Sequence, residues 1–161
     1  MSATLRHIVK AMRAATLLLG TSLAVSAIAH EHQHAFGAGQ PGDTKHPART
    51  VEVTATDADG HMTFSPDRLD IAKGAQVRFN IRNAGALEHE FVIGDKTENA
   101  EHAKMMAEMP DMKHDDPNAV TIPAGKSASL VWRFSKPGVF EFACLIAGHY
   151  ESGMHGVVIV K

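Results

Sequence analysis

The sequence predicts an all-β protein in which short strands pack as a sandwich or barrel and one helical insertion interrupts them. The first observation behind this prediction is that apolar and polar residues alternate in short runs from residue 50 onward, which is the period-two pattern of half-buried strands. The second is that turn-forming residues separate the runs, as at residues 83–85 and 136–138. About seven such runs are typical of antiparallel sandwiches and barrels.

The predicted strands follow one another along the chain. In the third, Val77, Phe79 and Ile81 alternate with polar residues, so their side chains share one face. The last is a continuous apolar run that closes the chain. The predicted strands lie at residues 51–55, 69–71, 77–81, 91–93, 130–134, 139–143 and 157–160.

One segment lacks this alternation of apolar and polar residues. Residues 98–112 are rich in Ala, Glu, Lys and Met, most of which favour helices. A helix is therefore predicted within residues 98–112, spanning 98–109 and ended by Pro110. Residues 115–118 then return the chain to the sheet.

The first 29 residues have the layout of a secretory signal peptide. Basic residues from Arg6 to Arg13 precede an apolar stretch at 14–25, and Ala27 and Ala29 follow as small residues. We expect cleavage after Ala29. The alternative is a membrane anchor, but the apolar stretch is shorter than the ~20 residues that span a bilayer. No second apolar stretch of that length follows, so we expect no membrane association after cleavage.

Residues 30–49 contain His, Gly, Pro, Ala and Gln without periodicity, and we expect a disordered, His-rich arm there. The predicted organisation is therefore a signal peptide at 1–29, this arm at 30–49 and one domain at 50–161. The net charge is −2, and the bases of the leader leave the remainder more acidic. That charge and an aromatic share of 6% argue against nucleic acid as a partner.

The residue counts single out cysteine, histidine and methionine. The chain has one Cys, 11 His and 8 Met. One Cys excludes an internal disulfide, a four-thiolate zinc site and a cluster that needs several thiolates. In an oxidising compartment an unpaired thiol is prone to oxidation unless it is bound to another group. The lone Cys144 therefore needs a functional explanation.

Cys144, His149 and Met154 follow one another with four residues in each gap. Cys144 follows one predicted strand and Met154 precedes the last, so the three side chains share a loop at one end of the sheet. A thiolate, two imidazoles and a weak thioether form the blue-copper set, and His89 is the candidate second imidazole because it precedes the strand at 91–93. Each residue taken alone has an ordinary explanation. Cys144 could be a small buried core residue, His89 and His149 surface residues, and Met154 a packing residue. Zinc is the main competing metal, but it rarely uses a thioether.

The residues around these positions resemble a known family. The first run comprises Phe64, Ser65, Pro66, Ile71, Gly74, Val77, Phe79 and His89, and the second comprises residues 137–144 with His149, Met154 and Gly156. Both resemble the small cupredoxins of the plastocyanin and azurin kind, over about residues 50–161. The resemblance implies a Greek-key β-sandwich with one type 1 copper, bound by His89, Cys144, His149 and Met154, that cycles between Cu(I) and Cu(II). Residues 112–120 further resemble periplasmic cupredoxins linked to bacterial copper tolerance.

One position departs from the family pattern. Cupredoxins usually place Asn directly after the first His ligand, whereas this chain has Glu90. The hydrogen bonds around the ligands, and hence the reduction potential, are therefore not predicted by the family pattern. Met154 is the expected axial ligand, with Glu90 and His155 as the alternatives.

Two further clusters are candidate secondary copper sites. After cleavage the chain would begin at His30, and its free amine, two backbone amides and the His32 imidazole could surround Cu(II) in a square plane, with His34 nearby. The alternative is a solvated tail.

The second cluster lies in the insertion, where His102, Met105, Met106, Met109, Met112 and His114 gather. Thioethers prefer Cu(I), so this cluster is a candidate for a second, weaker copper site. The alternative, which we favour, is that the Met residues are the helix face that packs on the sandwich.

These observations favour a monomeric copper-binding protein of the periplasm that takes part in copper tolerance, because a pure electron carrier needs neither cluster. The alternative is a dedicated electron-transfer carrier. An enzyme is not expected, since multicopper oxidases and nitrite reductases need several such domains. Apolar residues at 86–87 and 145–147 are expected to surround His149 and to suit brief docking of a redox or copper-handling partner.

Overall fold

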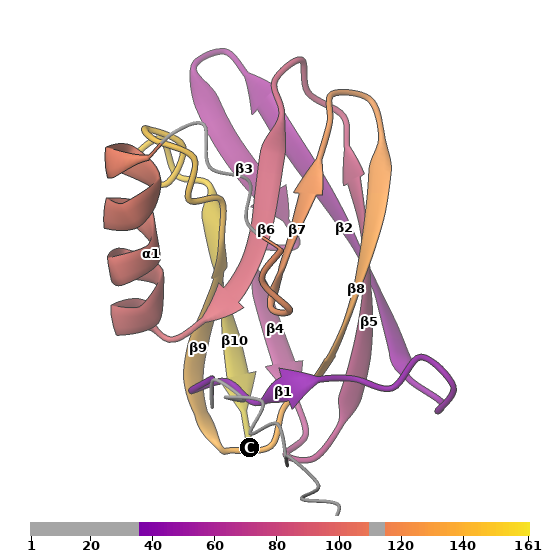
Figure 1. Cartoon of the computed structure of the whole chain (residues 1–161). Coiled ribbons are helices and arrows are strands. Elements are labelled where there is room, and N and C mark those ends of the chain that lie inside the picture. Colours follow the sequence, from indigo (N-terminus) through magenta and orange to yellow (C-terminus); the bar gives the residue numbers. More distant parts are fainter. Residues whose placement is uncertain (1–35, 110–114) are drawn as a thin grey trace, which may run out of the picture. The chain divides into compact units, whose positions relative to one another are not determined.

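Two five-stranded β-sheets face each other in the computed structural model, which describes residues 36–109 and 115–161 (Figure 1). The first sheet has the strand order β1-β8-β5-β2-β3, with β1 at Gln40–Pro41, β8 at Ser127–Arg133, β5 at Gln76–Asn83, β2 at Arg49–Ala58 and β3 at His61–Ser65. The second has the order β4-β10-β9-β6-β7, with β4 at Arg68–Ile71, β10 at His155–Val160, β9 at Gly138–Ala143, β6 at His89–Gly94 and β7 at Ala119–Ile122.

The sheets confirm the predicted β-sandwich with one short helical insertion. They differ from a purely antiparallel arrangement at two pairs, because β2 runs parallel to β5 and β4 runs parallel to β10. The chain leaves the first sheet after β3, adds β4 to the second sheet, and returns as β5 beside β2. This exchange between sheets is what places the end of β2 next to the turn that follows β5.

The core lies between the sheets and follows the alternation in the sequence. Val77, Phe79 and Ile81 of β5 are each 0% exposed, as the period-two pattern predicts. From the other sheet, the ring of Phe91 stacks on that of Phe142 with centroids 5.2 Å apart. Phe79 of the first sheet contacts Phe91 of the second with ring centroids 5.2 Å apart, so aromatic packing joins the two sheets.

The helix α1, Lys96–Glu108, begins two residues before the predicted start. Asp95 caps it, because its carboxylate accepts hydrogen bonds from the N–H groups of Thr97 and Glu98. The Glu98 carboxylate accepts in return from the N–H of Asp95, which completes a capping box. The helix covers the outer face of the second sheet through Ala103, which packs on the small cluster of Val92, Ala143 and Leu145.

The segment at residues 36–48, here called the strap, was expected to belong to a disordered arm, and the structure corrects this expectation. Phe36 packs edge-on against Trp132 with ring centroids 5.4 Å apart. The buried Gln76 side chain donates hydrogen bonds to the carbonyls of Asp43 and His46. A lack of hydrophobic periodicity therefore did not mean disorder, because a few anchored residues hold the strap against the first sheet.

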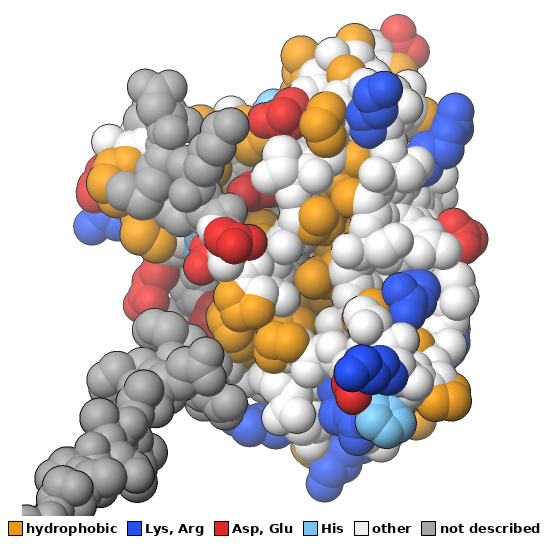
Figure 2. All heavy atoms as spheres, turned by 45° about the vertical axis from the view of Figure 1, so that its right-hand side comes forward, with side chains coloured by type: hydrophobic (Ala, Val, Ile, Leu, Met, Phe, Trp, Pro, Cys, Tyr) orange, Lys and Arg blue, Asp and Glu red, His pale blue; other side chains and the backbone are white. Residues whose placement is uncertain are grey.

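Several predicted features lie outside the described residues. They include the signal peptide at 1–29, the cluster His30, His32 and His34, and the residues Met112 and His114. The one helix of the described region is too short and too polar to cross a bilayer. Figure 2 shows one face of the molecule, on which hydrophobic side chains run down the middle and Lys and Arg side chains lie along the right-hand and lower sides.

Candidate metal centre

Three side chains converge at one end of the second sheet. His89 is the first residue of β6, and Cys144 directly follows β9, the neighbouring antiparallel strand. His149 comes from the loop at residues 144–154, here called the ligand loop, which joins β9 to β10 at the upper end of Figure 1. Nδ1 of His149 lies 3.3 Å from Nδ1 of His89 and 3.3 Å from Sγ of Cys144. The structure therefore brings together three of the four residues that were predicted to bind a metal.

The spacing of these atoms fits a single metal ion. Bonds from a first-row metal ion to imidazole nitrogen and thiolate sulfur are about 2.0–2.1 and 2.3 Å, which places donor atoms about 3.3–3.8 Å apart around a three- or four-coordinate ion. One ligand atom from each of His89, Cys144 and His149 lies within 4.8 Å of the others. Among the described residues this is the group of His, Cys, Asp and Glu side chains that could hold an ion.

Burial sets the protonation of the three groups. It lowers the pKa of His89 and of His149 below the usual 6.5, because a charged imidazole loses its hydration there. Both rings are therefore neutral at pH 7 and each has one nitrogen free to bind a metal. Burial also raises the pKa of the Cys144 thiol to about 11, so a metal ion must displace its proton.

Met154 lies at the neck of the ligand loop, just before β10, and is 0% exposed. Its carbonyl accepts a hydrogen bond from the N–H of Cys144 at 3.0 Å, and its own N–H donates to the carbonyl of His149 at 3.1 Å. The backbone thus ties Met154 to two of the converging residues. The side chains of Glu90 and His155, the alternatives for an axial ligand, do not belong to the converging group.

Comparisons with known proteins agree with this geometry. A model of the cupredoxin-like domain matches residues 17–160. This chain belongs to the cupredoxin-like family.

The cupredoxin-like chain is similar to proteins whose names refer to copper. It is 47% identical to the copper-resistant cuproprotein CopI of Rubrivivax gelatinosus, over 83% of this chain and 79% of that protein. It is 36% identical to CopI of Pseudomonas aeruginosa, over 92% of this chain and 95% of that protein. Among solved structures, auracyanin B aligns with a TM-score of 0.62 at 27% identity, covering 79% of this chain and 98% of that one.

In this cupredoxin-like domain the residue after His89 contacts the thiol through its backbone. The N–H of Glu90 donates to Sγ of Cys144 at 3.3 Å, which replaces part of the hydration that the buried sulfur loses. The Glu90 side chain is itself buried, with the residue 6% exposed. The departure from Asn at this position therefore leaves the backbone hydrogen bond to sulfur in place.

Two polar residues that support His89 were not predicted from the sequence. Asn83, at the end of β5, donates from its side chain to the carbonyls of Leu87 and Ile122 and accepts from the N–H of Gly85. Asp57, near the end of β2, has its Oδ2 3.4 Å from Nε2 of His89. Asn83 was marked in the sequence only as a turn residue, and nothing local marks Asp57, because the parallel pairing of β2 with β5 is what brings it to the site.

The backbone around Asp57 fixes its carboxylate. The N–H groups of Ala86 and Leu87 donate to it at 2.6–3.0 Å. These hydrogen bonds hold the pKa of Asp57 below its ordinary value, because they stabilise the charged form. The turn before β6 is thus built around a buried negative charge.

The helical cluster of candidate copper ligands is not packed as expected. His102 is mostly buried and lies 3.7 Å from the carboxylate of Asp116. Met105 and Met109 are 39% and 38% exposed, and the helix residue in contact with the sheet cluster is Ala103. The preferred interpretation, that the Met residues form the packing face, is therefore wrong for Met105 and Met109. Met106 is intermediate in exposure.

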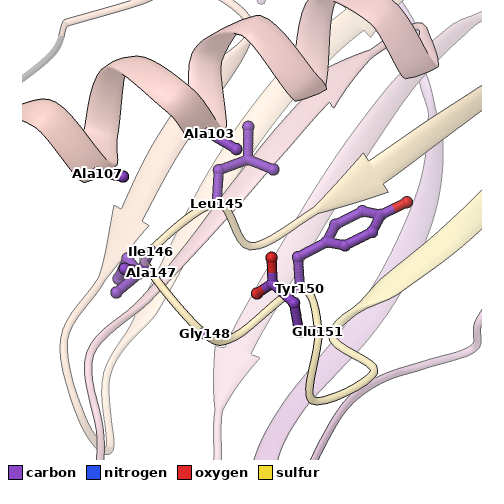
Figure 3. A pocket seen from close by; sticks show the side chains of 8 residues that line it. All are labelled: Ala103, Ala107, Leu145, Ile146, Ala147, Gly148, Tyr150 and Glu151. Carbon is purple, nitrogen blue, oxygen red and sulfur yellow. The ribbon is translucent and has the colours of Figure 1, made fainter.

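A shallow pocket of about 230 Å³ lies between α1 and the ligand loop (Figure 3). In Figure 3 the Leu145 side chain points toward Ala103 of the helix. Leu145 is 2% exposed, so it packs under α1 and does not belong to the predicted apolar surface around His149. Ala147 and Leu87 are exposed, as that prediction requires. The residues lining the pocket are Ala103, Ala107, Leu145, Ile146, Ala147, Gly148, Tyr150 and Glu151.

Proposed function

We propose that this protein binds one copper ion through His89, Cys144 and His149, with Met154 as the axial ligand, and serves copper tolerance in the periplasm. The observation that carries the proposal is the approach of two neutral imidazoles and one thiol to 3.3 Å in a buried site. This donor set is that of blue-copper centres. The likeness to two CopI proteins over most of their length supports copper tolerance as the role.

Each residue contributes a distinct property to such a site. Cys144 supplies a thiolate once its proton is lost, and the N–H of Glu90 stabilises that charge. His89 and His149 are held neutral by burial, so they bind without first losing a proton. Bound copper would supply the capacity to accept and release one electron. Burial of Cys144 and Met154, both 0% exposed, limits access of water to the site.

A dedicated electron-transfer carrier is the second candidate function. The observation in its favour is that His149 is 9% exposed and is preceded by the exposed residues Ala147 and Gly148. A ligand this near the surface gives a partner a short path to the site. The partner would dock briefly, since the exposed apolar area there is small.

The metal assignment is tested by the copper content and visible spectrum of the mature protein. We expect one copper per chain and an intense Cu(II)–thiolate absorption that Cys144→Ser abolishes. His149→Ala should weaken copper binding at least tenfold, whereas the matched control His46→Ala, in the exposed part of the strap, should leave it unchanged. A Cys144→Ser variant that keeps the absorption would refute the assignment.

The two functions are separated by deletion of the gene. Copper tolerance predicts growth that fails at raised copper while respiration is unaffected, whereas a carrier predicts loss of electron flow to a particular oxidase at ordinary copper. Fractionation of cells tests the location, because a periplasmic protein is released by osmotic shock and starts at His30. A full-length chain retained in the cytoplasm would overturn the periplasmic role.

A further inference from the structure

A carboxylate lies behind one of the proposed copper ligands. Oδ2 of Asp57 is 3.4 Å from Nε2 of His89, and the two side chains are 7% and 0% exposed. Nδ1 of the same ring faces His149 at 3.3 Å. The His89 ring therefore has the proposed metal site at one nitrogen and a negative charge at the other.

The charge is built into the turn before β6. The carboxylate accepts from the N–H groups of Ala86 and Leu87, so it cannot turn away without leaving these donors unpaired. Gly85 makes the approach sterically feasible, since a Cβ at that position would lie only 2.4–2.6 Å from the carboxyl atoms of Asp57. Asp57 and the turn therefore fit each other closely.

This arrangement has two consequences for the imidazole. Nε2 of His89 makes no hydrogen bond of good geometry in the described part of the chain, and the Asp57 carboxylate, 3.4 Å away, is the acceptor that faces its proton. A proton on Nε2 leaves the lone pair on Nδ1, where the metal site is. A carboxylate at the outer nitrogen also makes the ring a stronger donor, and such charge acts strongly where water is excluded.

We propose that Asp57 is a positioning residue that fixes the Nε2–H tautomer of His89 and favours Cu(II) over Cu(I) at the site. This rests on the proposed function, namely copper binding by His89, Cys144 and His149. A carboxylate that served only to cap the turn would need an acceptor oxygen but no charge. Asparagine provides that oxygen, so Asp57→Asn separates the two roles.

The experiment compares three variants with the wild-type protein. Asp57→Asn removes the charge, and Gly85→Ala displaces the carboxylate while keeping it. Asp43→Asn is the matched control, because Asp43 also accepts a backbone N–H, from Lys45, and lies 2.8 Å from a histidine, His46, but belongs to the strap. Each protein is titrated with Cu(II) and, separately, with Cu(I) against competing chelators, and the His89 tautomer is read from long-range ¹H–¹⁵N NMR of the metal-free protein.

We expect Asp57→Asn to weaken Cu(II) binding relative to Cu(I) binding about tenfold, which is a rise of about 59 mV in reduction potential. Gly85→Ala should change the ratio in the same direction, and Asp43→Asn should change it less than twofold. The metal-free wild type should show His89 with its proton on Nε2, and Asp57→Asn should reduce that preference.

Other results would overturn the inference. An unchanged affinity ratio in Asp57→Asn, or an equal change in Asp43→Asn, would show that this carboxylate does not favour Cu(II). A proton on Nδ1 of His89 in the wild type would overturn the tautomer assignment even without copper. If Asp57→Asn does not fold, the affinity ratio of Gly85→Ala decides. Failure of the wild type to bind copper at Cys144 would instead refute the proposed function.

Discussion

The backbone N–H of Cys144 donates a hydrogen bond to the carbonyl of Met154 at 3.0 Å. This bond closes the ligand loop at its neck, so the two residues that begin and end the loop are held together before any metal binds. Gly153 turns the chain into Met154 with φ +102, a conformation that favours glycine. The loop is thus a closed unit whose geometry depends on a few backbone positions.

Gly153→Ala is expected to destabilise the protein by about 2 kcal/mol and to weaken the Cu(II)–thiolate absorption. A Cβ at this position would be strained by the positive φ and would lie 3.3 Å from the carbonyl oxygen of Met62. Gly125→Ala is the control, since Gly125 also has a positive φ but nothing within 4 Å of an added Cβ. Urea unfolding and visible spectra of both variants measure the effect, and equal losses would contradict a special role for Gly153.

Metal-free protein should lose stability at alkaline pH because of Cys144. Burial raises the pKa of its thiol from 9.0 to about 11. Below pH 9 the thiol is protonated in both the folded and the unfolded chain. Between about pH 9 and 11 the unfolded chain alone loses this proton, so the free energy of unfolding should fall by about 2 kcal/mol over that range.

Urea unfolding of metal-free wild type and Cys144→Ser at several pH values checks this expectation. The difference between the two isolates the thiol from Tyr150, whose pKa is also raised by burial. Above pH 9 the free energy of unfolding should fall more steeply for the wild type than for Cys144→Ser. Parallel curves would show that the Cys144 thiol ionises as readily in the folded protein as in the unfolded one.

Met154→Leu should leave the fold intact and change the electronic properties of bound copper. The side chain is 0% exposed, and exchange of Met for Leu in a core usually costs less than about 1.5 kcal/mol. Loss of the proposed axial thioether should raise the reduction potential while the thiolate absorption persists. Met62→Leu, at a partly buried position packed on the core, is the control. An unchanged potential in Met154→Leu would remove Met154 from the ligand set.

The exposed methionines in α1 and at its C-terminal cap should be oxidised before Met154. Met105 and Met109 are 39% and 38% exposed, against 0% for Met154, and oxidation to the sulfoxide requires access. Limited treatment with hydrogen peroxide followed by peptide mass spectrometry measures the order. In denaturant the rates should become equal. Oxidation of Met154 at the same rate in the folded protein would contradict its burial.

Much of the fold could be predicted because hydrophobic alternation reports burial directly. Val77, Phe79 and Ile81 predicted β5, and the apolar run at 157–160 predicted β10. The strands β1, β3 and β7 were not predicted, since with two, five and four residues they are too short to show a clear alternation. Their positions depend on pairing with strands elsewhere in the chain, which no local pattern records.

The candidate site was predictable where its residues lie close together in the sequence, and not where strand pairing brings them together. Cys144 and His149 share one loop, so their spacing alone predicts that they lie close together, and Met154 at the end of that loop is tied to both through the backbone. Asp57 is brought to His89 by the parallel pairing of β2 with β5, a relationship between separate segments. The exposure of Met105 also could not be read from helical spacing, because spacing defines a face but not which face is covered.

His89 and His149 are separated by 60 residues in the chain, yet their Nδ1 atoms lie 3.3 Å apart. An ion held between them would tie β6 to the ligand loop as a cross-link, in a protein whose one cysteine cannot form an internal disulfide. The unfolded chain lacks this preformed site, so binding of the ion would stabilise the folded chain alone. Copper supply and resistance to unfolding would then be coupled, so that the protein persists longest in the cell when the metal is abundant.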